Sequence, residues 1–134
     1  MAVKTHNALG LRVIPPKGKS VVEYVGRFAG GSTTATLDTA RSSQGLTVAH
    51  AGADGEYTVT LPGKGAMTFL GASASVIDAA GELIGVVNVK SASETARTVT
   101  FEHFEDITTT HSTLTAQDLA ATEDMFVRIL VAQL

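Results

Sequence analysis

The chain has 134 residues but no cysteine and no tryptophan, and only 17% of its residues are charged. The absence of cysteine excludes disulfide frameworks, thiolate nucleophiles and cysteine-ligated zinc. Ten basic residues against thirteen acidic residues give a formal net charge of -3. This balance is unlike the basic footprint of a nucleic-acid-binding protein. We therefore expect no nucleic-acid partner.

Long apolar runs are also missing. No stretch approaches the roughly 20 apolar residues that a membrane-spanning helix needs. The N-terminus carries Lys4, His6 and Arg12 without a continuous apolar segment, so it does not resemble a secretory signal. We expect no membrane partner and synthesis in the cytoplasm of the producing cell.

Small and β-forming residues are abundant, with 18 Thr, 19 Ala and 13 Gly. High Thr and Gly content with modest charge is typical of half-buried strands that are linked by tight turns. The length indicates one domain, and a chain of this size can bury a core without a metal or a disulfide. The low charge fraction also suggests a protein that is packed against something.

The first twenty residues differ from the rest. Leu9, Leu11 and Val13 alternate, and Pro15-Pro16 then imposes an extended, non-helical path. We predict an extended arm over residues 1–20, lying on the body or reaching a neighbour, and a β domain over residues 21–134. A frayed terminus is the alternative.

From Val21 onward the hydrophobic period is two, which predicts strands. In "LTVAHAGADGEYTVTLPGKG", two alternating runs flank a corner at Asp54 and Gly55, where Gly55 can supply the positive φ of a hairpin turn. The pattern predicts an all-β fold, namely an antiparallel β-sandwich or jelly roll of roughly eight strands. The expected strands and hairpins cover 21–28, 33–39, 46–61, 68–78, 83–90, 98–104 and 125–132.

The C-terminal segment "TAQDLAATEDMFVRILVAQL" allows two interpretations. One is a helix from Thr115 with Asp118 in a loose capping box. The other is a helical turn, a polar corner at 122–124 and a final strand with Val127, Ile129 and Val131 at period two. The β-branched residues favour the strand.

Motifs for chemistry are weak. "PPKGKS" lacks the first glycine of a phosphate-binding loop, because that position is Val13, and "GASAS" lacks the second glycine of a nucleophile elbow, so Ser73 and Ser75 are expected to be strand residues. The spacing of the four histidines fits no ligand pattern. "EHFED" (102–106) is interpreted as a solvated strand end, with a metal site or catalysis as the alternatives. We expect no cofactor, no metal and no catalytic residue, and we interpret Asp54-Gly55 as a turn.

The order of "GLTVAHAGADGEYTVTLPGKG", the "VIDAAGE" corner and the apolar ending "DLAATEDMFVRILVAQL" resembles a group of small virion proteins of tailed bacteriophages. The resemblance is to head decoration (cement) proteins or head fibres and covers about residues 45–134. It implies a compact jelly-roll-type β-sandwich, often trimeric, with a structural role and no catalysis.

The resemblance implies a decoration protein that binds the major capsid protein at capsomer junctions on the capsid surface of the virion. Leu9, Leu11, Val13 and Ile14 are expected to contact the capsid or a neighbouring copy by adding to a strand. One alternative is a tail or fibre adhesin for host glycans, for which Phe101 and Phe104 are the nearest aromatic pair. A second is a small metal-dependent hydrolase that uses His103 and His111.

Overall fold

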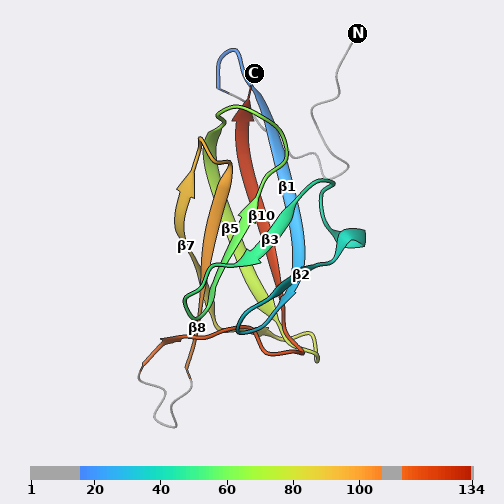
Figure 1. Ribbon diagram of the computed structural model, residues 1–134, viewed down its shortest axis with the longest axis vertical. Coiled ribbons are helices and arrows are strands. Elements are labelled where there is room, and N and C mark those ends of the chain that lie inside the picture. Colours follow the sequence, from blue (N-terminus) through green and yellow to red (C-terminus); the bar gives the residue numbers. More distant parts are fainter. Residues whose placement is uncertain (1–15, 107–112, 134) are drawn as a thin grey trace.

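The computed structural model describes residues 16–106 and 113–133 and has two packed antiparallel sheets (Figure 1). The first sheet has the strand order β2-β1-β10-β5-β6, and the second has the order β3-β4-β8-β7, with β9 paired to β8. The predicted all-β sandwich is confirmed. The strands are β1 (Ser20–Gly30), β2 (Ala35–Leu37), β3 (Thr47–His50), β4 (Glu56–Thr60), β5 (Thr68–Ile77), β6 (Leu83–Ile84), β7 (Val86–Ser93), β8 (Thr98–Glu105), β9 (Thr115–Ala116) and β10 (Asp124–Gln133), and a 3-10 helix, η1, spans Thr39–Arg41.

The return strand predicted over 83–90 is two strands instead of one. Gly85 has φ +64 and separates β6, which pairs with β5, from β7, which pairs with β8. A Cβ at Gly85 would lie 2.5 Å from the carbonyl oxygen of Phe104. Glycine therefore permits the chain to cross from the first sheet to the second at this point.

The C-terminal segment is a strand, as favoured from its β-branched residues. β10 lies at the centre of the first sheet and pairs with β1 on one side and β5 on the other. The helix considered from Thr115 is absent from this described segment, and so is the single helical turn. β9 and a turn closed by the bond from Glu123 N–H to the Ala120 carbonyl take their place.

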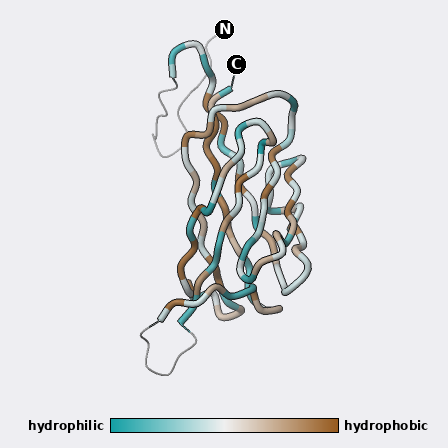
Figure 2. The backbone as a smooth tube through the Cα atoms, turned by 60° about the vertical axis from the view of Figure 1, so that its left-hand side comes forward, coloured by the Kyte–Doolittle hydropathy of each residue, from teal (hydrophilic) through white to brown (hydrophobic). Residues whose placement is uncertain are grey.

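The core lies between the sheets. β10 contributes Met125, Val127, Ile129 and Val131, which are at most 2% exposed. They face core residues of both sheets, including Phe28, Tyr57, Val59, Val99 and Phe101. Figure 2 shows the apolar stretches running along the strands. This packing is the main source of stability, since burial of apolar surface drives folding.

Residues 1–15 lie outside the described residues, so the N-terminal arm stays a prediction, together with its residues Leu9, Leu11, Val13 and Ile14. The described chain opens with a turn in which Lys19 N–H donates to the Pro16 carbonyl at 3.1 Å. β1 then starts at Ser20, beside the end of β10 (Figure 1).

Candidate functional site

The outward positions of β3, β4 and β8 differ in chemistry from the outer face of the first sheet, whereas β7, at the edge of the second sheet, exposes Val86 by 46% and Val89 by 38%. On the second sheet, the outward positions of β3, β4 and β8 carry mainly threonines, and the hydroxyl oxygens of Thr58 and Thr100 lie 2.8 Å apart. Glu56, at the end of this face, forms an ion pair with Lys90. This is the polar face that a solvated sheet normally presents.

The outer face of the first sheet is mixed, with apolar residues lying between paired charges. Along β1 and β10, every second residue is buried in the core and the residues between them point outward. Val25 is one of these outward residues and is 40% exposed. On β5, Leu70 is the extra residue at a register shift opposite β10 and is 42% exposed. We call the following residues the apolar face: Val21, Val25, Leu70, Phe126 and Leu130.

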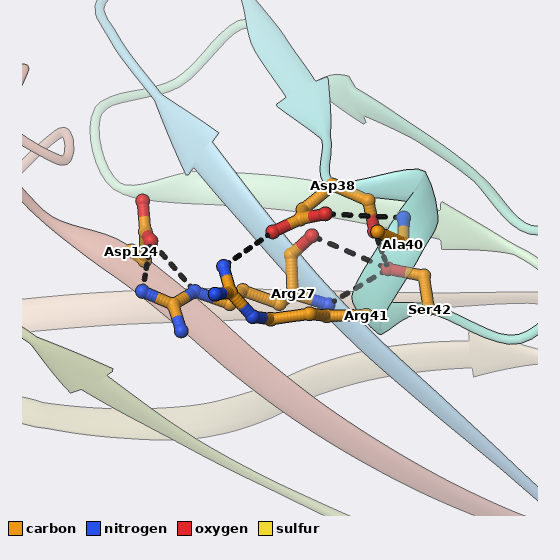
Figure 3. A network of polar contacts seen from close by, with 6 residues as sticks. All are labelled: Arg27, Asp38, Ala40, Arg41, Ser42 and Asp124. Carbon is orange, nitrogen blue, oxygen red and sulfur yellow. Dashed lines mark hydrogen bonds and ion pairs between the residues drawn. The ribbon is translucent and has the colours of Figure 1, made fainter.

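The charged groups among the outward positions of β1, β10 and β5 are all paired. Arg128 Nε donates to Glu23 Oε1 at 2.9 Å, and Arg27 lies 2.7 Å from Asp124 Oδ2 (Figure 3). The Arg27 guanidinium also lies 4.7 Å from the centre of the Phe126 ring, within the range of a cation–π contact. The hydrogen bond and the charge of Glu23 raise the pKa of Arg128 above its usual value.

Because two cations balance two anions, a partner can cover the apolar face without burying an unpaired charge of this chain. Burying an unpaired charge is the costly case. The face also contains a shallow hollow of about 330 Å³ lined by Leu70, Gly71, Ala72, Ser73, Arg128 and Leu130. Gly71 leaves it open, since a Cβ there would meet nothing within 4 Å.

A separate polar cluster lies around the β3–β4 turn. Gly52 N–H donates to His50 Nδ1 at 3.0 Å, so the ring proton is on Nε2, which donates to Asp118 Oδ1 at 2.7 Å. The same oxygen accepts the N–H of Gly55 at 2.8 Å. A His–Asp pair can orient a catalytic base, but the free nitrogen of His50 is already occupied by a backbone donor. The cluster therefore holds the turn against the segment before β10.

The turn itself contains the two residues singled out from the sequence. Asp54 and Gly55 lie between Ala53 and Glu56, whose backbone groups bond at 3.1 Å, and Gly55 has φ +75. Asp54 is not a member of the His50–Asp118 hydrogen bonds. The link to Asp118 was missed from the sequence because it joins residues 63 and 68 positions apart.

His103 is buried, so the interpretation of its segment as a solvated strand end is wrong for this residue. Its Nδ1 lies 3.0 Å from the Gln117 carbonyl, and its Nε2 has no hydrogen-bond partner among the described residues. Glu105 Oε1 is 3.6 Å from Nε2. The period-two pattern of β8 does predict this burial, because His103 lies on the same face of the strand as the buried Val99 and Phe101.

The other candidates from the sequence are dispersed. Ser73 and Ser75 lie in β5, as expected of strand residues. Phe101 is fully buried, so it cannot form an exposed aromatic pair with Phe104. No group of three or more His, Asp or Glu that could hold a metal occurs in the described ranges, and His111 lies outside them.

Comparison of the chain with models of protein families, with curated proteins and with solved structures gave no match. Within residues 16–106 and 113–133, no helix is long and apolar enough to cross a membrane.

Proposed function

We propose that this chain is a structural protein of a bacteriophage virion that decorates and stabilises the capsid. It binds the major capsid protein at capsomer junctions, with three copies acting together, on a jelly-roll-type sandwich. The observation that carries the proposal is the contrast between the apolar face of the first sheet, with Val25 and Leu70 exposed by 40% and 42%, and the threonine-rich outward positions of β3, β4 and β8. The resemblance of residues 45–134 to head decoration proteins agrees with it.

In this proposal the apolar face lies against the shell and the threonine face is turned to solvent. Large exposed apolar patches on soluble proteins mark interaction sites. The paired charges of Glu23 with Arg128 and of Arg27 with Asp124 allow this face to be covered without loss of a charge partner. Three linked copies would multiply a modest contact through avidity.

The first test asks whether the protein is part of a particle. Mass spectrometry of purified virions from the source that encodes the chain should find it in stoichiometric amounts. Its absence from the virion would refute the proposal. If it is present, the shells are stripped of it and the purified protein is added back.

The add-back assay compares two variants that each introduce one glutamate, on opposite faces of the sandwich. Leu70→Glu places a charge on the apolar face, and Thr47→Glu places one at an exposed position of the second sheet. We expect Leu70→Glu to weaken cosedimentation with the shells at least about tenfold, since a buried unpaired carboxylate costs more than 1.4 kcal/mol. Thr47→Glu should bind like the native chain, and equal binding by both variants would exclude the apolar face as the contact.

A further inference from the structure

The outer edge of β1 is covered over only part of its length. β2 pairs with positions 28–30, and the segment after β2 covers the next positions. Arg27 N–H donates to Ser42 Oγ at 3.1 Å (Figure 3), and Ser43 N–H donates to the Val25 carbonyl at 2.8 Å. Val25 N–H in turn donates to Ser43 Oγ at 2.9 Å.

The first half of β1 is left open at this edge. In an antiparallel strand, both backbone groups of a residue point to one edge, and successive residues alternate. Val25 and Arg27 point away from β10, so Val21 and Glu23 do too. Their N–H and C=O groups have no partner among the described residues. An unpaired strand edge of this kind is a template for another strand.

The side chains beside the open edge have a defined pattern. Val22 and Tyr24 point inward and pack on the core, while Glu23 points outward and is 38% exposed. The segment "LGLRVI" (9–14) has the matching alternation. Any strand register that puts Leu9, Leu11 and Val13 beside the inward residues puts Arg12 on the side of Glu23. Apolar residues then meet apolar residues, and a cation meets an anion.

We propose that residues 9–14 of one copy add as a strand to the open edge of β1 in a second copy. The turn at 16–19 decides between a second copy and the same chain. Gly18 has φ +75, whereas Lys17 is not among the described residues with positive φ, which makes this turn type II. Type II turns splay the two strands that they join, in contrast to the primed turns of tight hairpins. A two-residue loop of this type is therefore disfavoured for a hairpin within one chain, which favours a second copy as the recipient of the strand.

The donated segment matches the open half of β1 in length, because the six residues 9–14 span about 20 Å as a strand. The eleven residues of β1 cover about 36 Å. Only Pro15 separates this segment from the turn at 16–19, so the receiving copy must lie directly beside the turn. Each copy then gives one strand and receives one, which builds a reciprocal dimer or, where the rotation between copies closes, a ring. The inference concerns copies of the chain in solution and does not rest on the virion role, so either can fail without the other.

The first experiment measures the mass of the full chain and three variants by light scattering after size exclusion. Val21→Pro removes an N–H that makes no described bond, and proline is tolerated at such edge positions. Val21→Thr is the matched control, because it keeps this N–H and the β-branched shape. We expect the native chain and Val21→Thr to be oligomers of the 13.8 kDa chain. Val21→Pro and a chain lacking residues 2–14 should be folded monomers by circular dichroism.

The second experiment asks which chain supplies the strand, and it remains informative if Val21→Pro fails to fold. The native sequence has no cysteine, so Arg12→Cys and Glu23→Cys are made in separate chains, mixed, and treated with a short bis-maleimide. We expect a covalent product of one chain of each kind. In a chain with both substitutions, a crosslink confined to the monomer would show pairing within the chain and overturn the inference. A native chain that stays monomeric, or an oligomer that persists without residues 2–14, would also overturn it.

Discussion

Tyr57→Phe tests whether the hydroxyl of Tyr57 links the β1–β2 turn to the segment before β10. The side chain is fully buried, and its hydroxyl donates to the Gly31 carbonyl at 3.1 Å and accepts Leu119 N–H at 2.8 Å. The substitution leaves the N–H of buried Leu119 without an acceptor. An unsatisfied buried group costs about 1–3 kcal/mol in the free energy of unfolding. For a chain of 134 residues, this loss corresponds to a melting temperature lower by about 4–11 °C.

The pH dependence of the same variant gives a sharper test. Burial raises the pKa of Tyr57 above its usual value of 10.0, and the charges of Asp118 and Glu123 act in the same direction, against the hydrogen bond from Leu119. The folded chain thus holds the phenol proton more tightly than the unfolded chain. The contribution of Tyr57 to stability is fully present below about pH 10, and it is lost as the pH rises through the folded-state pKa.

The assay is urea unfolding of both proteins, followed by far-UV circular dichroism, because the chain has no tryptophan. The difference in unfolding free energy should be constant from about pH 7 to pH 9 and should shrink above about pH 10. All other side chains are common to the two proteins, so their contributions cancel in the difference. A difference below about 0.5 kcal/mol at neutral pH, or one that grows at alkaline pH, would refute the reasoning.

Three further substitutions, each with a control substitution, test other close contacts. Gly55→Ala should lower the free energy of unfolding by more than about 2 kcal/mol, because φ is +75 and the new Cβ would lie 2.5 Å from the His103 carbonyl oxygen. Gly52→Ala is the control: φ is +100 but the space is open, so the loss in the same urea assay should be smaller. Gly30→Ala should lower stability by about 1–3 kcal/mol through overpacking against the Tyr57 ring at 2.7 Å, whereas Gly71→Ala should be nearly neutral by calorimetry. Asp118→Ala should lower the free energy of unfolding by about 2–4 kcal/mol, because it leaves the donors of His50 and Gly55 unpaired. Asp118→Asn keeps an acceptor oxygen and should cause a smaller loss. Equal losses in the two variants would contradict the role of Oδ1 as the shared acceptor.

Local alternation was enough to predict most strands, because period-two burial is a property of each strand alone. It located the hairpin at Asp54-Gly55 and the strand at the C-terminus. It failed at Gly85, where five of the eight residues in 83–90 are apolar and continue the pattern through a change of sheet. It could not reveal the ion pairs of Glu23 with Arg128 or of Arg27 with Asp124, since these depend on β1 lying next to β10 across about a hundred residues. Strand order is not encoded in the local pattern.

The sequence of β10 also indicates the apolar face, because apolar residues occur on both sides of this strand. A search for strict alternation overlooks this feature. In "DMFVRILVAQ" the inward residues are apolar, and so are Phe126, Leu130 and Ala132 at the outward positions. A strand that is apolar at both parities is typical of one that is covered on both faces, whereas a half-solvated antiparallel strand alternates. The second sheet covers only the inward face of β10. The outward side of β10 also carries the paired charges Asp124 and Arg128, so its sequence lies between these two patterns. Its partly exposed apolar residues are the physical reason to test this face for a partner.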